Sequence, residues 1–384
     1  MSRSDAMTLS DKIRHAANLA RLAPSSHNCQ PWLVRVFSPE FYYANLDLAA
    51  GSRHPLRQVL VLGLDRARCL SALPSLQREM RMSIGAFATL FHNFLRLQGL
   101  AVEARLVPEF GCALTDLGAQ RLDGCEPLLV LLVGEEQGDA QPVTLARLQK
   151  TVEARRTLRT PYMRPQRGTP ALHPEAALPY RLQASALLHW RHCDNEADIE
   201  RLARFVGQYA ERDFSDARAW AETYRFIDFS ARSGSIEGDG FNIQQLTGPL
   251  PRWKRWLYRC ALAPALVPLS ARCGFTGRIA SQLGELVGRS ASLCYLSYSG
   301  DAGAAAQQQV LAGEAMLAHW LAATEQGLAL HPVSVVLQHG EIRERLECLL
   351  AEPNEVWFFA RLGQPIAPPA MQFRYRRTVE PLLC

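Results

Sequence analysis

The sequence predicts an α+β protein built from two tandem halves. A length of 384 residues is enough for two domains or for one large domain. Segments with strand-like alternation and segments with helical periodicity follow one another along the chain. The clearest boundary is residues 134–142 (Gly-Glu-Glu-Gln-Gly-Asp-Ala-Gln-Pro), which are polar, lack periodicity and contain glycine and proline. We therefore expect an N-terminal half over 1–140 and a C-terminal half over 141–384.

The N-terminal half begins with a predicted helix over 9–22. This helix should end before Pro24, because a residue that precedes proline is disfavoured in helical geometry. Residues 56–73 are also helix-like and should end at Pro74. The other elements expected here are strands at 32–37, 42–48, 102–107 and 128–133, a turn at 51–55 and a long apolar helix at 78–98.

The C-terminal half begins with an amphipathic helix over 145–156. A second strong helix over 304–326 has apolar residues on one face and ends at Gly327, a favourable C-cap residue. The other elements expected here are helices and loops over 196–232, a sharp turn at 236–241 and strands at 292–299 and 355–362.

The composition is that of an ordinary globular protein, with 48% hydrophobic and 21% charged residues. A net charge of +5 is small for this length and gives no argument for nucleic acid, and we identify no basic block that interleaves with aromatic residues. The modest positive charge suits an anionic ligand such as a phosphate. We therefore expect a small-molecule partner and no nucleic acid.

The ten cysteines indicate neither a disulfide framework nor a metal site. They are scattered singly, without a Cys-x-x-Cys pair and without a histidine at zinc-ligand spacing. The longest apolar stretch, 260–271, is broken by two prolines and is too short to span a bilayer. Residues 1–12 lack the apolar core of a signal peptide. We expect a cytoplasmic protein with reduced thiols, no metal and no membrane association.

A polar corner follows the first helix, at residues 23–32 (Ala-Pro-Ser-Ser-His-Asn-Cys-Gln-Pro-Trp). Ser25, Ser26 and Asn28 are N-cap formers, so a short helix can begin here, with hydroxyls, an amide and backbone N–H groups close together. Such a corner suits the polar edge of a planar heterocycle, which needs donors and acceptors in fixed directions. The alternative is a helix–loop–helix corner that satisfies only its own backbone.

This corner resembles the Ala-Pro-Ser-Ser-His-Asn-Thr-Gln-Pro-Trp signature of the nitroreductase superfamily of flavoproteins. More narrowly, it is similar to the double-length branch named after the mycobacterial Acg protein. Nine of ten positions match, and Cys29 stands where the branch usually has threonine. The resemblance implies a nitroreductase-like fold and a flavin ring contacted by the side-chain amide of Asn28. Against the branch pattern, residues 55–76 are interpreted as an insertion.

A second motif, at 155–162 (Arg-Arg-Thr-Leu-Arg-Thr-Pro-Tyr), is similar to the arginine motif of nitroreductases. Taken alone, three arginines usually form a solvated helix face. The resemblance implies instead that Arg155, Arg156, Thr157 and Arg159 bind the flavin phosphate and the carbonyl edge of the ring. Arginine suits both tasks, since its planar fork of donors matches a dianionic phosphate or an anionic reduced ring.

The last hundred residues resemble the C-terminal part of the superfamily. Residues 327–334 resemble the loop that passes the N5 edge of the flavin, which assigns that edge to the backbone of Ser334 and Val335. Arg376 and Arg377 lie where relatives have a further phosphate-binding arginine or lysine. Residues of about 235–275 resemble a lid over the flavin, although they could equally be surface-packing residues. His331 is interpreted as structural, and we assign no catalytic side chain.

The two sets of motifs are complementary, because the corner is present only in the first half and the arginine motif only in the second. The resemblance therefore implies a fused pseudo-dimer with one working FMN site, functional as a monomer or as a further dimer. We expect an FMN-dependent oxidoreductase that transfers a hydride between the flavin and a small organic acceptor, with NAD(P)H as reductant. The alternative is a catalytically silent flavin-storage protein with a closed lid.

Overall fold

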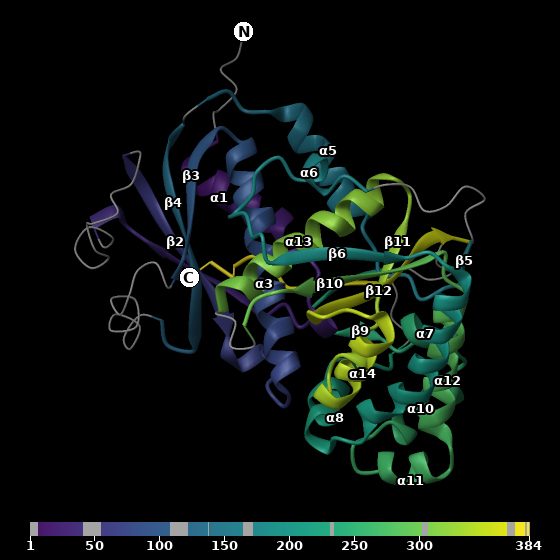
Figure 1. Ribbon diagram of the computed structural model, residues 1–384. Coiled ribbons are helices and arrows are strands. Elements are labelled where there is room, and N and C mark those ends of the chain that lie inside the picture. Colours follow the sequence, from purple (N-terminus) through teal and green to yellow (C-terminus); the bar gives the residue numbers. More distant parts are fainter. Residues whose placement is uncertain are drawn as a thin grey trace.

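A computed structural model of the protein contains two larger β-sheets with two long helices between them, and its described residues also form two small two-stranded sheets (Figure 1). It describes residues 7–40, 55–107, 122–136, 138–163, 172–230, 234–301, 306–366, 373–380 and 382–383. One sheet uses strands that precede residue 137, and the other uses strands that follow residue 161. The expected α+β class is confirmed, while the domain boundary at 140/141 stays a prediction.

The N-terminal sheet has the strand order β1-β2-β4-β3, and its neighbours pair antiparallel. Its strands are β1 (Trp32–Phe37), β2 (Leu56–Asp65), β3 (Leu100–Leu106) and β4 (Cys125–Glu136). The far end of the chain returns to this sheet, because the backbone N–H of Val34 donates to the carbonyl oxygen of Leu382 at 2.8 Å. Residues at the two ends of the sequence therefore pack together.

The prediction of a helix over 56–73 is wrong, because this segment contains strand β2 and the short 3₁₀ helix η3 (Arg66–Arg68). Strand β2 lies between β1 and β4, and every residue from 59 to 64 is buried. A strand covered on both faces carries a continuous apolar run, which periodicity cannot distinguish from a buried helix. Residues 56–65 are thus a central part of the sheet, while the interpretation of 55–76 as an insertion relative to the branch stays a prediction. Pro74 begins the next helix instead of ending the previous one, as proline does at a first helical position.

The two central helices are α3 (Pro74–Leu97) and α13 (Ala306–Glu325). They cross at Gly85 and Gly313, where a Cβ atom on either glycine would lie 1.9 Å from a carbonyl oxygen of the other helix, that of Val310 or Met82. The two backbones therefore touch directly. Residues of both helices belong to the main hydrophobic core, which extends to strands of both sheets.

The C-terminal sheet has the order β11-β12-β10-β6, with β5 paired to β12. Its strands are β5 (Tyr162–Met163), β6 (Leu188–Cys193), β10 (Ser292–Tyr298), β11 (Ala329–Pro332) and β12 (Glu355–Pro365). A second core packs residues of β10 and β12 against three helices. These helices are α7 (Glu196–Tyr209), α12 (Phe275–Gly288) and α14 (Gly340–Leu350).

Shorter elements surround these layers. Helices are α1 (Leu9–Ala20), η1 (Ser26–Asn28), α5 (Pro142–Ala154), α6 (Pro174–Ala177), η5 (Ala210–Phe214), α8 (Ala217–Tyr224), α9 (Gln244–Thr247), α10 (Arg252–Ala261), α11 (Val267–Arg272) and η6 (Ser334–Val336). Strands are β7 (Ile227–Asp228), β8 (Gly234–Glu237), β9 (Phe241–Asn242) and β13 (Phe373–Arg376). No helix in the described ranges is both long and apolar enough to cross a membrane.

Most of the other expected elements are confirmed to within a few residues. These are the strands at 32–37, 102–107, 128–133, 292–299 and 355–362 and the helices at 9–22, 78–98, 145–156 and 304–326. Gly327 has a φ angle of 73°, as expected of a glycine that ends a helix. The strand expected at 42–48 and most of the turn at 51–55 lie outside the described residues.

Candidate functional site

A cavity of about 870 Å³ brings the separate sequence motifs together. Its walls come from the corner, the arginine motif, the segment after β11, strand β13 and helices α3 and α12. Ten of the eleven residues predicted to bind the cofactor line it: Ser25, Ser26, Asn28, Arg155, Arg156, Thr157, Arg159, Ser334, Val335 and Arg376. Their assignment to a particular ligand stays a prediction.

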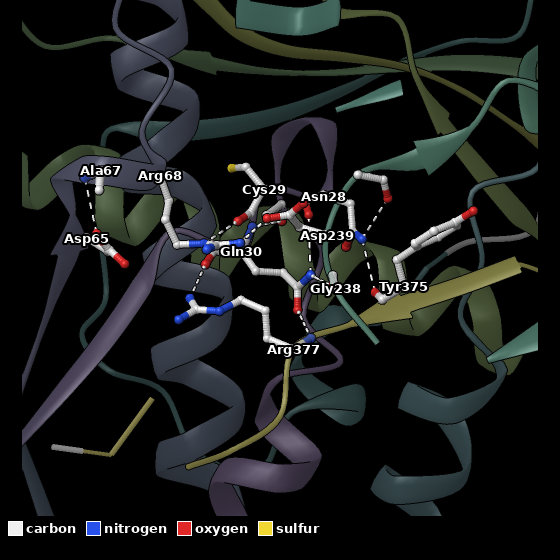
Figure 2. Close-up of polar contacts among 12 residues, drawn as sticks. Asn28, Cys29, Gln30, Asp65, Ala67, Arg68, Gly238, Asp239, Tyr375 and Arg377 are labelled. Atoms are coloured by element: carbon white, nitrogen blue, oxygen red, sulfur yellow. Dashed lines mark hydrogen bonds and ion pairs between the residues drawn. The ribbon is translucent and has the colours of Figure 1, made fainter. Parts of the chain in front are cut away.

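Arg377 is the exception, because it does not line the cavity and contacts Gln30 of the corner instead. Its backbone N–H donates to Oε1 of Gln30 at 2.9 Å, and its Nη1 donates to the Gln30 carbonyl oxygen at 3.0 Å (Figure 2). Arg377 follows the last residue of β13, and these two hydrogen bonds hold it against Gln30. The structure therefore assigns Arg377 to holding the corner, and Arg374, two residues before Arg376, lines the cavity in its place.

A distinctive feature of the cavity is a group of arginines whose like charges lie close together. Arg155, Arg156, Arg374 and Arg376 line one part of it. Burial, followed by the charges of Arg156 and Arg374, lowers the pKa of Arg155 to about 9. Burial and the neighbouring arginines also hold the pKa of Arg376 well below its ordinary value. We call these four residues the arginine cluster.

The hydrogen bonds of the arginine cluster leave donors unused. Arg155 Nη2 and Arg376 Nη2 both donate to the carbonyl oxygen of Leu22, at 3.0 and 3.2 Å. The Nε atoms of Arg155 and Arg376 are buried and have no hydrogen-bond partner among the described residues. Buried cations are normally paired, because desolvation of an unpaired charge is costly. A bound anion with several acceptor oxygens, such as a phosphate, would compensate both the charge and the unused donors.

The corner has a strained backbone that other segments hold in place. His27, Asn28 and Gln30 have φ angles of 50°, 53° and 51°, which lie in the left-handed region. Residues other than glycine seldom adopt this region, although asparagine and histidine tolerate it better than most. Gln30 Nε2 donates to the carbonyl oxygen of Gly238 at 2.9 Å, which ties the corner to the turn before β9. The ion pair between Arg68 and Asp239 joins the same turn to η3 (Figure 2).

The side-chain amide of Asn28 forms hydrogen bonds within the protein, and its predicted contact with a flavin ring stays a prediction. Its Nδ2 donates to the carbonyl oxygens of Gly240 and Tyr375, at 2.9 and 3.0 Å, and its Oδ1 accepts from Arg376 Nη1 at 2.8 Å. Both amide hydrogens are therefore used within the protein. The structure also gives Asn28 the task of orienting Arg376 in the arginine cluster. Cys29, its neighbour, is buried and does not line the cavity.

Two carboxylates, which sequence reasoning missed, also line the cavity. Glu79 on α3 accepts a hydrogen bond from the Ser26 hydroxyl, and burial raises its pKa. Burial and the nearby charge of Glu79 raise the pKa of Asp213, on η5, to about 7. Glu79 lies in the helix that sequence analysis interprets as core, whereas nothing in the sequence near Asp213 signals its position. The pair can hold and exchange a proton near neutral pH.

A chain of hydrogen bonds continues from this pair into the corner. The Ser26 hydroxyl lies 3.0 Å from Nδ1 of His27, and Nε2 of His27 lies 3.3 Å from the hydroxyl of Thr223. Burial, followed by the charge of Arg159, lowers the pKa of His27 to about 4, so the ring is neutral at pH 7. The Ser26 hydroxyl thus contacts both the neutral ring of His27 and the carboxyl group of Glu79.

Arg159, His331 and the segment predicted to be a lid also lie at the cavity. Arg159 lies over the ring of Phe241, with its Cζ atom 5.8 Å from the ring centroid, where both residues line the cavity. His331 is buried, and its Nδ1 lies 3.2 Å from Nη1 of Arg361. Burial and two arginines lower its pKa well below the ordinary value, which supports the structural interpretation of this histidine. Nine of the ten residues from 240 to 249 line the cavity together with Tyr258 and Leu262, inside the segment predicted to be a lid.

We predict that Asp213 makes stability depend on pH. Its pKa is about 7 in the folded protein and about 3.9 in an unfolded chain. Below pH 4 the carboxyl is protonated in both states, so the free energy of unfolding should decrease as the pH rises from 4 to 7. Asp213→Asn should remove about 1–2 kcal/mol of this decrease, less than the full pKa shift implies, since the residue is only half-buried. Urea unfolding of the variant and of the wild-type protein at pH 5 and pH 8 measures this change in the free energy of unfolding.

The matched control for Asp213→Asn is Asp139→Asn, at an exposed position before α5. This variant should keep the pH dependence of the wild-type protein. If Asp213→Asn and Asp139→Asn change the pH dependence equally, the carboxyl of Asp213 is not desolvated as the structure indicates.

Fold and site together define an α+β protein with a large arginine-rich cavity suited to an anionic small molecule. The chain is 31% identical over 361 residues to the protein named "Probable NAD(P)H nitroreductase PigM" of Serratia sp. strain ATCC 39006, covering 93% of this chain and 89% of that protein. No protein-family model matches the chain. On the strength of the Serratia relative, the chain belongs to the nitroreductase family.

Two solved structures give weaker likenesses. A nitroreductase-type protein of Anabaena variabilis ATCC 29413 has a TM-score of 0.40 at 11% identity, over 94% of this chain and 90% of that one. The FMN-dependent nitroreductase NfnB of Mycobacterium smegmatis, solved with NADPH, has a TM-score of 0.33 at 14% identity, over 58% of this chain and 88% of that one. Both TM-scores are low, so family membership rests on the Serratia relative.

Proposed function

We propose that the protein is an FMN-dependent oxidoreductase that transfers a hydride between the flavin and a small organic acceptor. The observation that carries this proposal is the arginine cluster (Arg155, Arg156, Arg374 and Arg376), in which like charges lie close together and the buried Nε atoms of Arg155 and Arg376 have no hydrogen-bond partner among the described residues. FMN has a terminal phosphate that such a cluster would neutralise, and the volume of about 870 Å³ is ample for a cofactor and a small substrate. Family membership favours a flavin over other phosphate-bearing ligands.

The residues present fit FMN in their chemistry. The unused Nε donors of Arg155 and Arg376 would bind phosphate oxygens, and Asn28 orients Arg376 for this task. Arg159, close to the ring of Phe241, would place a positive charge near the flavin ring, which is anionic when reduced. FMN itself supplies the hydride chemistry, and the protein supplies binding, orientation and electrostatics. The backbone of Ser334 and Val335 is our proposed contact for the N5 edge.

Reduction of most organic acceptors by a hydride also requires a proton. Glu79 and Asp213 line the cavity, and the raised pKa of Asp213, about 7, allows it to carry a proton at neutral pH. We therefore propose this pair as the group that holds a proton beside the acceptor. The hydroxyl of Ser26 donates to Glu79 and fixes the direction of that carboxylate.

A single chain should form the complete site. The cavity draws Ser26 and Glu79 from the first 140 residues and the arginine motif from the rest of the chain. This supports the proposed fused pseudo-dimer, in which one polypeptide supplies what two subunits would otherwise contribute. The placement in the Acg branch also stays a prediction.

We predict that the purified protein binds one FMN per chain. The reason is that the corner and the arginine motif each occur once in the sequence and meet in the same cavity. Heat extraction, followed by absorbance of the released flavin and a protein assay, gives the ratio. A ratio near two, or extraction of FAD instead of FMN, would contradict the assignment of a single FMN site.

The test of the oxidoreductase function is the reduction of the bound flavin by NADH and by NADPH in a stopped-flow spectrometer. The name of the Serratia relative, an NAD(P)H nitroreductase, supports the choice of reductant. We expect rapid bleaching of the flavin absorbance by at least one nucleotide. Flavin that is photoreduced normally but unchanged by either nucleotide would favour storage, a role that the lining of the cavity by residues of the predicted lid also fits.

A further inference from the structure

Helix α10 has an apolar face that points away from the protein. Trp253 and Trp256 are 63% and 67% exposed, and Leu257 is exposed as well. Because a helix has about 3.6 residues per turn, these three positions lie on one side. The opposite side carries Tyr258, which packs against Phe275 with ring centroids 5.3 Å apart. An amphipathic helix normally buries its apolar stripe, whereas here a second apolar stripe faces solvent.

Further exposed apolar residues lie at the start of α11 and within it. Leu266 and Leu269 are exposed, so five of the twelve large hydrophobic residues exposed in the described ranges lie between residues 253 and 269. The other five tryptophans of the protein are buried or half-buried. Single exposed apolar residues are common on protein surfaces, but a group of this kind usually marks an interaction site. Figure 1 shows α10 and α11 together at the lower end of the molecule.

The charged residues that α10 and α11 themselves carry are all basic, whereas Glu211 and Glu341, from η5 and α14, lie beside α11. Between Asp239 and Glu285 the chain has six arginine and lysine residues and no acidic residue. Arg252, Lys254 and Arg259 are exposed on α10 beside the tryptophans. Residues 252–259 (Arg-Trp-Lys-Arg-Trp-Leu-Tyr-Arg) therefore interleave basic and aromatic side chains, so the expectation that the sequence has no such block is wrong.

We propose that α10 and α11 dock on the surface of an anionic lipid bilayer. The tryptophans and leucines would enter the boundary between headgroups and acyl chains, and the flanking cations would contact lipid phosphates. Tryptophan in particular favours this boundary, since its ring is apolar but carries one polar N–H. The sequence-based expectation of no membrane association rests on the lack of a spanning segment and does not address a helix that lies on the surface.

Charge complementarity favours a bilayer over the other occupants. A second copy of this chain docked face to face by a two-fold axis would bring two sets of basic residues together. Nucleic acid would satisfy the cations but would leave Leu257, Leu266 and Leu269 against a charged backbone. An anionic bilayer alone offers negative charge at its surface and an apolar phase directly beneath it.

The proposal has a consequence for the cavity, although it does not depend on which ligand the cavity holds. Tyr258 and Leu262 line the cavity from the inner side of the helix whose outer side carries Trp253 and Trp256. Docking would therefore place a wall of the cavity directly against the lipid surface.

The test is co-sedimentation of the full-length protein, as purified, with vesicles. One set contains phosphatidylcholine alone, and the other contains phosphatidylcholine with phosphatidylglycerol. We expect binding to the anionic vesicles, a blue shift of tryptophan emission on binding, and weaker binding as salt is added. Trp253→Ser/Trp256→Ser should weaken binding to anionic vesicles about tenfold or more, and Lys254→Gln/Arg259→Gln should do so through charge.

Matched controls are Val143→Ser, on α5 and 83% exposed, and Arg204→Gln, exposed on α7; both should bind as the wild-type protein does. Far-UV circular dichroism checks that each variant is folded. Absence of binding to anionic vesicles, or equal binding by the tryptophan double variant, would overturn the proposal. Gel filtration in which that variant alone dissociates a dimer would assign the surface to a second copy. Duplex DNA binding lost in the same variant, without vesicle binding, would assign it to nucleic acid.

Discussion

Arg155→Gln and Arg376→Gln should each purify with little FMN and should rebind it about ten- to a hundredfold more weakly than the wild-type protein. Each variant loses a charge-assisted contact to the proposed phosphate, which typically contributes about 1.5–3 kcal/mol. Glutamine keeps a side-chain donor for the carbonyl oxygen of Leu22, to which both arginines donate. Titration of the apo-protein with FMN, followed by quenching of flavin fluorescence, gives the dissociation constants.

The stability of the apo-variants distinguishes lost phosphate binding from misfolding. Burial and like charges lower the pKa values of both arginines, which means that their charges disfavour the folded apo-protein at neutral pH. Removing one charge should therefore leave the free energy of unfolding unchanged or increase it, while FMN affinity decreases. In a misfolded variant, both the free energy of unfolding and the affinity for FMN would decrease.

Arg225→Ala is the matched control, because this arginine is exposed and lies over the ring of Phe226, outside the residues that line the cavity. It should retain FMN as the wild-type protein does. If all three variants purify with equal flavin, the arginine cluster is not the phosphate site and the proposed orientation of the ligand is wrong.

The sequence predicted the walls of the site better than the contacts within it. Ser26, Arg155 and Ser334 are each more than a hundred residues from the other two along the chain, yet all three line the same cavity. This success came from motif resemblance, because a motif preserves which segments meet. Resemblance does not specify every partner, and Asn28 shows the difference, since the sequence gives no sign of its hydrogen bonds to Gly240, Tyr375 and Arg376.

The errors have physical causes that a single sequence does not reveal. Strand β2 was mistaken for a helix because burial on both faces removes the alternation that identifies a strand. Asp213 was missed because its raised pKa arises from Glu79 and from burial, neither of which local sequence encodes. The outward face of α10 was not predicted, because the segment of about 235–275 was interpreted only as a lid or as surface packing. Each error depends on what lies on the other side of an element, which only the tertiary structure shows.

Gly85→Ala and Gly313→Ala should each destabilise the protein by about 3 kcal/mol or more, near the upper end for overpacked cores. Within a helix, alanine is ordinarily more stable than glycine by about 0.5–1 kcal/mol, so the expected sign opposes helix propensity. The reason is steric, because a Cβ atom at either position would lie 1.9 Å from a carbonyl oxygen of the facing helix. A rigid helical backbone cannot move aside as the end of a side chain can.

The control for this pair is Gly340→Ala, in the first turn of α14, where an added Cβ atom would have no neighbour within 4 Å. It should be neutral or slightly stabilising, as helix propensity alone predicts. Urea unfolding of the three variants gives the comparison. The same substitutions should also affect the cavity. Glu79 and Ser83 on α3 and Trp320 on α13 all line it, so an increase in the spacing of the two helices would displace these residues. Both glycine variants should therefore bind FMN more weakly even where they are folded, whereas wild-type stability in Gly85→Ala would show that the helices do not touch through their backbones.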